Sequence, residues 1–232
     1  MSVPEKTPAL EKKGIMPALA IMSLILGLAA FIGWQTYSNK SAVSPSLQEQ
    51  LNEQGAFKFP QAINITDVPF INEEGDVVGK ENNLGKWSFL FFGYTFCPDV
   101  CPTTLAVMQQ TWVKLNPAQQ AKTQIVLVSV DTERDTPEQL KTYMDYFDPS
   151  FTSFTGKPAS LRSFAAQLNA VYAKVERQNA EGEVDPELGY LMDHSANIAI
   201  LDPNGNYYGF IKPPFSPKKM LAVMNMIQYS QK

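Results

Sequence analysis

The chain has 232 residues, enough for one well-buried domain with additional segments but not for two large domains. Its 19 Lys and Arg stand against 23 Asp and Glu, and the net charge of −4 excludes the basic field that nucleic-acid binding needs. With two cysteines and one histidine, the chain is neither a disulfide-rich miniprotein nor a four-cysteine zinc protein. Metal chemistry would therefore depend on Cys97, Cys101 and His194, helped by carboxylates or Met.

The first predicted element is a membrane-spanning helix. No charged residue occurs in residues 15–34, and about 20 apolar residues are enough to cross the hydrocarbon core of a bilayer. The run is longer than the apolar part of a typical signal peptide, although a cleavage site at residues 41–43 remains an alternative. We therefore expect a single membrane anchor over residues 15–37.

Lysines on both sides of this run predict its orientation. Lys6, Lys12 and Lys13 precede it and only Lys40 closely follows it, so the positive-inside rule keeps the N-terminus in the cytoplasm. The rest of the chain would then be exported, and the simplest interpretation is a single-pass protein of the bacterial inner membrane with a periplasmic domain. The expected organisation is a cytoplasmic tail, an anchor, a polar linker and a folded domain, over residues 1–14, 15–37, 38–56 and 57–232.

Strands and helices alternate along the expected domain. A Glu-Glu-Gly-Asp turn predicts a hairpin over residues 69–79, and the apolar run over residues 87–92 predicts a strand covered on both faces. Thr136, Pro137 and Gln139 form the start signal of a helix. The same reasoning predicts further strands over residues 125–130, 151–154 and 171–177, helices over 102–115, 159–169 and 216–229, and a closing hairpin over 195–211. This order predicts a mixed α/β sheet with a thioredoxin-like layout.

The two cysteines lie where a predicted strand gives way to a helix, in the segment FGYTFCPDVCP of residues 92–102. A helix N-terminus favours thiolate over thiol, and a thiolate is both a metal ligand and a redox nucleophile. Thioredoxin-type redox sites have two residues between their cysteines, whereas three separate Cys97 from Cys101. The wider loop allows both sulfurs to face one ion without preventing a disulfide. Metal binding, redox chemistry and a structural disulfide therefore all remain open.

His194 lies just before the predicted strand that opens the closing hairpin. In a thioredoxin-like layout the loop before that strand lies beside the cysteine loop, so we expect His194 to face the thiols. Two thiolates and one imidazole suit Cu(I), and with an added oxygen ligand Cu(II), at one copper per domain. A structural zinc site would need a fourth protein donor. Asp193 is either a partner for the imidazole or a turn residue, and Met192 is interpreted as a core residue.

Three segments resemble the Sco (SenC) family of copper-binding assembly factors: GKWSFLFFGYTFCPDVCPTTL, VSVDTERDTPEQLKTYMDYFDPSFTSFTG and YLMDHSANIAILDPNG. The resemblance implies a thioredoxin-like fold with an inserted β-hairpin, and copper ligands at Cys97, Cys101 and His194. It also implies a role in maturing the binuclear CuA centre of cytochrome c oxidase, by copper delivery, thiol reduction or both. The implied partners are the copper-bearing oxidase subunit and a periplasmic copper donor.

Three functional hypotheses use these residues differently. The first is a membrane-anchored copper metallochaperone, which is not an enzyme. The second is a periplasmic thiol-disulfide oxidoreductase or peroxidase, or a redox or stress sensor, that uses the same cysteines. The spacing of the cysteines counts against general disulfide chemistry, and Thr95 lies too close to Cys97 for a peroxiredoxin motif. The third is a structural adaptor with an inert disulfide, which leaves His194 without a role.

Overall fold

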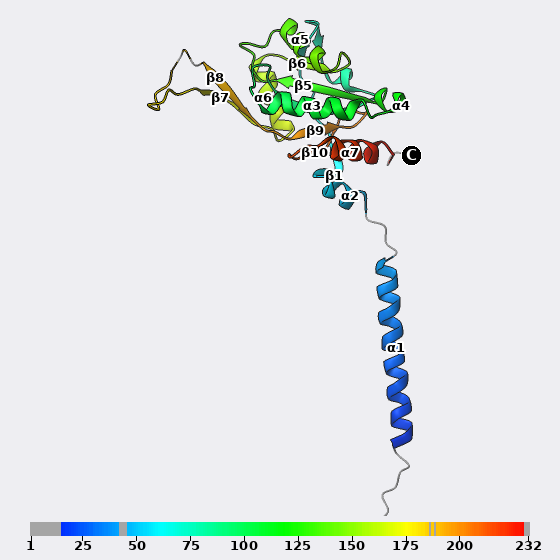
Figure 1. Ribbon diagram of the computed structural model, residues 1–232. Helices are drawn as coiled ribbons and strands as arrows, with labels where there is room; N and C mark the ends of the chain where they lie inside the picture. The colour runs from blue at the N-terminus through cyan, green and yellow to red at the C-terminus, as the bar shows by residue number, and fades with distance from the viewer. Residues whose placement is uncertain (1–14, 42–45, 186, 188, 230–232) are drawn as a thin grey trace, which may run out of the picture. The chain divides into compact units, whose positions relative to one another are not determined.

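The computed structural model describes residues 15–41, 46–185, 187 and 189–229, and the chain divides into two compact units, Met1–Pro45 and Ser46–Lys232. The first unit contains one helix, α1 (Ile15–Ser41) (Figure 1). Within the part of the chain whose side chains the structure describes, residues 21–35 of α1 included, no helix is long and apolar enough to cross a membrane. The anchor over residues 15–37 is therefore not confirmed and stays a prediction, and the predicted tail over residues 1–14 lies outside the described residues.

The second unit is built on one mixed sheet of eight strands, in the order β1-β10-β9-β4-β5-β6-β2-β3. Its central strands β4, β5 and β6 are parallel, and the other neighbouring strands are antiparallel. The predicted thioredoxin-like mixed α/β sheet is thus confirmed, including the hairpin of β2 and β3. The strands are β1 (Ala56–Ile63), β2 (Phe70–Asn72), β3 (Val77–Val78), β4 (Trp87–Gly93), β5 (Thr123–Ser129), β6 (Thr152–Thr155), β9 (Ile198–Leu201) and β10 (Tyr207–Ile211).

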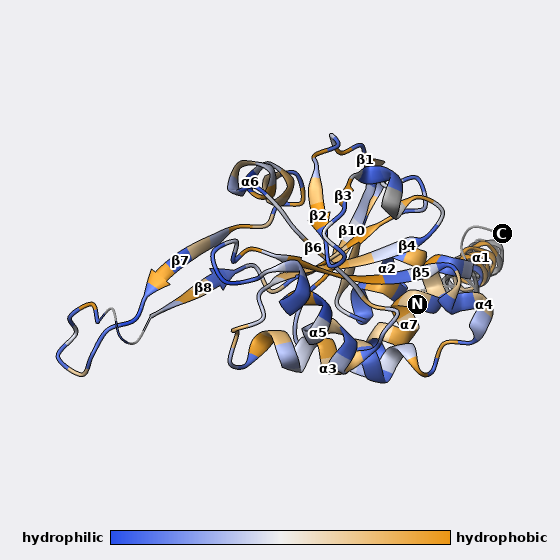
Figure 2. Ribbon diagram, turned by 90° about the horizontal axis from the view of Figure 1, so that it is seen from above, coloured by the Kyte–Doolittle hydropathy of each residue, from blue (hydrophilic) through white to orange (hydrophobic). Residues whose placement is uncertain are grey.

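Helices cover both faces of this sheet, with α3, α5 and α7 on one side and α6 on the other (Figure 2). All seven residues of β4 and all seven of β5 are buried, because apolar side chains meet helices on either side. Thr136 caps α5 through a bond from the Gln139 N–H to its Oγ1, as predicted. The helices are α2 (Leu47–Glu53), α3 (Val100–Trp112), α4 (Pro117–Gln120), α5 (Pro137–Phe147), α6 (Pro158–Gln167), α7 (Pro217–Tyr229) and the 3₁₀ turn η2 (Lys80–Asn83).

A second, two-stranded sheet forms the inserted hairpin. Strands β7 (Tyr172–Glu176) and β8 (Tyr190–His194) pair with each other and with no strand of the main sheet among the described residues. The hairpin reaches away from the rest of its unit in both ribbon views (Figures 1 and 2). Its base carries His194, which was expected in a loop and is instead the last residue of β8.

Part of the predicted linker is folded. Ser46 and Glu49 form a reciprocal capping box at the start of α2, and this helix buries Leu51 to 1% exposure in the core. Strand β1, which the sequence analysis did not predict, follows at Ala56 and pairs with β10. The compact unit therefore includes part of the segment assigned to the linker.

Candidate metal centre

The two cysteines lie at the junction of β4 and α3, as the sequence analysis predicted. Strand β4 ends at Gly93, and α3 begins at Val100 after a short loop. Cys97 is half-buried in this loop, and Cys101 is fully buried in the first turn of the helix. Both are free thiols in the structure. The loop thus leaves one sulfur accessible and one enclosed.

His194 faces the two sulfurs. One ligating atom from each of Cys97, Cys101 and His194 lies within 4.8 Å of the other two. The Nε2 atom of His194 is 3.5 Å from the Sγ of Cys101, and the backbone N–H of Cys101 points at the Sγ of Cys97 over the same distance. The expected convergence of the lone histidine on the dithiol is therefore confirmed.

The imidazole of His194 is held in one orientation. Its Nδ1 lies 3.2 Å from the carbonyl oxygen of Ser195, and because a carbonyl only accepts, Nδ1 carries the proton. Nε2 is then the ring atom that faces the sulfurs. The rings of Phe91 and Tyr94 contact the imidazole edge-on, with centres 5.6 and 6.1 Å from the centre of the imidazole. The partner role considered for Asp193 thus belongs to the Ser195 carbonyl.

Gly93 leaves room for the enclosed thiol. A Cβ atom at this position would lie 2.9 Å from the Sγ of Cys101, closer than real Cβ contacts, and 3.1 Å from Leu127 Cδ1, which is tighter than most.

The side chain of Met192, on β8, is buried, which confirms its interpretation as a core residue. The walls around the sulfurs are therefore packed, and the opening lies on the side of Cys97.

That opening is a hollow of about 210 Å³ whose lining is mostly apolar and also includes Asp99 and Asp193. Val100 and Leu191 line it, and both have exposed side chains. Phe96, the residue before Cys97, is 48% exposed. A partner can therefore approach Cys97 across mostly apolar surface.

One proton is shared between the two thiols. The thiol of Cys101 donates to Cys97, and together with His194 and nearby backbone N–H groups it lowers the pKa of Cys97 to about 3, against the opposing effect of burial. The same hydrogen bond, together with burial, raises the pKa of Cys101 above its ordinary value. Cys97 is thus a thiolate at neutral pH, as both a metal ligand and a redox nucleophile must be.

We expect iodoacetamide to modify Cys97 of the reduced, metal-free chain at a nearly constant rate between about pH 5 and about pH 8. The lowered pKa keeps Cys97 ionised over this range, whereas a thiol of ordinary pKa gains reactivity about tenfold per pH unit. Mass spectrometry of the modified peptide measures the rate. Cys101→Ala removes the donor and should restore the ordinary pH dependence. A steep profile in the unaltered chain would contradict the shared proton.

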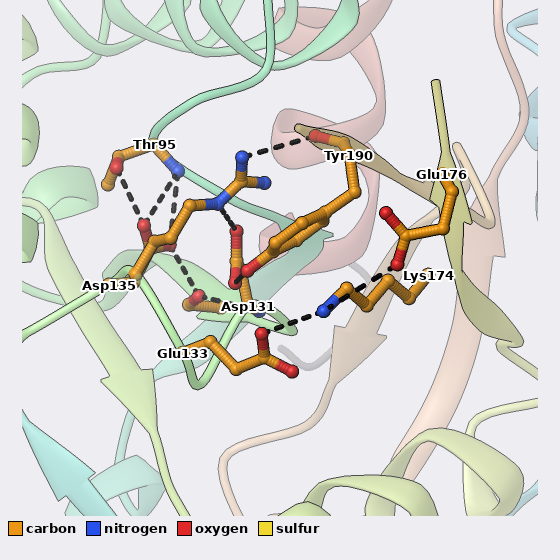
Figure 3. A network of polar contacts seen from close by, with 9 residues as sticks. Thr95, Asp131, Glu133, Asp135, Lys174, Glu176 and Tyr190 are labelled. Carbon is orange, nitrogen blue, oxygen red and sulfur yellow. Dashed lines mark hydrogen bonds and ion pairs between the residues drawn. The ribbon is translucent and has the colours of Figure 1, made fainter. Parts of the chain in front are cut away.

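The polar residues around the site were missed by the sequence analysis. Asp131, Arg134, Asp135 and Tyr190 connect the cysteine loop to the hairpin, as Figure 3 shows in part. The first three lie in the second segment quoted for the family resemblance, but no role followed from it. Contacts between residues so far apart in the chain have no local sequence pattern.

A thioredoxin-like α/β domain with a Cys-x-x-x-Cys loop at a helix N-terminus and a histidine facing it defines a class of thiol domains able to bind metal. Within that class the chain belongs to the SCO1/SenC family, whose sequence model matches residues 61–228.

Individual relatives agree with this membership. The SCO2-like protein RC0895 of Rickettsia conorii is 32% identical over 160 residues, which cover 68% of this chain and 74% of that protein. The crystal structure of Arabidopsis thaliana ScoI with copper bound is 29% identical, with a TM-score of 0.61 over 71% of this chain and 98% of that one. Bradyrhizobium japonicum ScoI with copper bound is also 29% identical, with a TM-score of 0.60 over 72% and 99% of the two chains.

Proposed function

We propose that the chain is a membrane-anchored copper metallochaperone that helps to assemble the CuA centre of cytochrome c oxidase. The single observation that carries this proposal is the convergence of Cys97, Cys101 and His194 within 4.8 Å. Membership of the SCO1/SenC family supports it. Copper is the cargo, received from a periplasmic donor and passed to the copper-bearing oxidase subunit.

The donor set suits copper better than zinc. Soft thiolates favour Cu(I), and an imidazole added to them accommodates Cu(II). The described residues offer three protein donors here, whereas a structural zinc site uses four. Because Cys97 is half-buried at a mostly apolar hollow, an acceptor protein has access to the sulfur from which the cargo would be transferred.

Two sequence features support the membrane anchor and the periplasmic location. Residues 15–34 carry no charge, and the described large apolar side chains of α1 are exposed around the helix. Lysines 6, 12 and 13 precede this run, which favours export of the C-terminal domain. A tether confines chaperone and oxidase to one membrane surface, so a weak contact is enough for transfer.

The lowered pKa of Cys97 favours one alternative, a thiol-disulfide oxidoreductase that reduces the cysteines of CuA. Both functions need the same thiolate. They differ in what the oxidised chain does, because oxidation removes both sulfur ligands at once.

We expect the full chain, purified anaerobically in detergent, to bind one copper when reduced and none when oxidised. Metal analysis after gel filtration measures the stoichiometry, and re-reduction should restore binding. A full copper equivalent on the disulfide form would contradict the proposal. Fast reduction of a generic disulfide substrate, without copper binding, would instead support the oxidoreductase.

A further inference from the structure

One short segment contacts both halves of the candidate metal centre. Residues 131–135, here called the 131–135 loop, lie in the connection between β5 and α5. One end of this loop bonds to the cysteine loop, and the other bonds to the β7–β8 hairpin (Figure 3). The cysteines belong to the first of these parts and His194 to the second, so the 131–135 loop bridges the two halves of the site.

The contact with the cysteine loop is made by Asp135, which is 4% exposed. Its carboxylate accepts from the backbone N–H of Thr95 at 3.0 Å and from the Thr95 hydroxyl at 2.6 Å. It also accepts from the hydroxyl of Ser129 at 2.5 Å. Thr95 lies two residues before Cys97, so these bonds fix the start of the cysteine loop to the end of β5.

The contact with the hairpin is made by Arg134 and Asp131. The guanidinium of Arg134 donates to Asp131 at 2.5 Å and to the backbone carbonyl of Tyr190 at 3.1 Å. The Tyr190 hydroxyl donates a hydrogen bond to the Asp131 carboxylate at 2.7 Å. The guanidinium also stacks 3.7 Å from the centre of the Tyr190 ring and lies 4.9 Å from the ring of Phe96, in the cysteine loop. Arg134 thus contacts both sides at once.

Lys174 adds a weaker contact from the other strand of the hairpin. Its ammonium group lies 4.0 Å from the Tyr190 ring centre and 2.8 Å from a carboxylate oxygen of Glu133. Both charged groups are well exposed, so this pair contributes little. The Asp131 side chain is only 1% exposed, and removing its partner would leave a buried carboxylate without its counter-charge. Of these two cations, Arg134 therefore makes the stronger attachment to the hairpin.

From these contacts we propose that Arg134 is a positioning residue, which holds the base of the hairpin so that His194 meets the cysteine thiolates. The proposal rests on the proposed copper function. The hairpin shares no strand pairing with the main sheet among the described residues, so side-chain contacts at its base decide where it lies. Tyr190 is four residues before His194 on β8, and a shift there would move the imidazole.

The consequence for copper depends on its oxidation state. Cu(II) prefers the imidazole nitrogen, whereas two thiolates alone satisfy Cu(I). Displacing His194 should therefore weaken Cu(II) binding more than Cu(I) binding. Mutation of a residue that orients a ligating histidine typically lowers metal affinity by roughly 10- to 100-fold.

The test compares Arg134→Gln with the unaltered full chain in competition titrations. We expect Cu(II) affinity to fall roughly tenfold or more and Cu(I) affinity to change by less than about threefold. Lys218→Gln removes one positive charge from an exposed site on α7, away from the hairpin, and should change neither affinity. In a His194→Ala background, Arg134→Gln should cause no further loss of Cu(II) affinity, because the residue acts through the imidazole.

Equal loss of both affinities, or an additive loss in the His194→Ala background, would overturn the proposal in favour of a merely structural role. If Arg134→Gln does not fold, Tyr190→Phe deletes only the hydroxyl bond to Asp131, and the same selective loss is expected. Hydrogen exchange of the metal-free chain supplies a readout independent of copper. Faster exchange confined to residues 190–194 supports the proposal, and unchanged exchange there rejects it, even if the unaltered chain bound no copper and the proposed function failed.

Discussion

A chain with both Cys97→Ser and Cys101→Ser should bind no copper under conditions in which the unaltered chain binds one equivalent. A serine hydroxyl is a hard, neutral donor that does not replace a thiolate on Cu(I), and His194 alone is a single ligand. Metal analysis of the full chain, purified anaerobically, measures the loss. The expected difference is complete, because the two substitutions remove two of the three converging donors.

Met192→Leu is the matched control, since it removes a soft sulfur that lies buried on the same strand as His194. Its copper content should stay at one. In a deletion strain grown with scarce copper, the control should restore CuA-type oxidase activity and the double serine variant should not. Copper retained by the double variant would reject the ligand assignment. Normal oxidase assembly without the gene would contradict the proposal that cytochrome c oxidase is the client. It would not contradict the assignment of the copper ligands.

The elements that surround the cysteines were predictable from the sequence because their signals are local. An uninterrupted apolar run identifies β4, and the cap of Thr136 with Pro137 identifies the start of α5. The nearness of His194 to the thiols followed from the thioredoxin-like layout that the element order predicts, because in that layout the loop before the corresponding strand lies beside the cysteine loop.

Other parts of the fold depend on contacts that leave no local pattern. Strand β8 is five residues long and pairs with β7 across a long connection, so its alternation is too brief to predict a strand. Strand β1 contains Pro60 and polar residues, and it is held by pairing with β10 near the C-terminus. The hydrogen bond from Arg134 to Tyr190 joins residues 56 positions apart in the chain, so only the folded structure reveals it.

Phe91→Ala should both destabilise the protein and weaken copper binding. The side chain is fully buried in β4, and its deletion from the core should lower the free energy of unfolding by about 3–5 kcal/mol. The Phe91 ring also contacts the imidazole of His194 and lies beside the space kept open by Gly93. Losing it frees the imidazole to turn away from the sulfurs. Urea unfolding and Cu(II) competition titrations measure the two effects.

Phe89→Ala separates the effect on the site from the effect on stability. Phe89 is equally buried in the same strand and on the same face, two residues before Phe91, and its ring makes no described contact with His194. Its loss should cost similar stability while the folded fraction keeps its copper affinity. If either alanine variant fails to fold, the paired Phe→Leu variants remove less buried volume, cost less stability and carry the same contrast. An equal fall in copper affinity for both positions would show that Phe91 acts on copper only through the stability of the core.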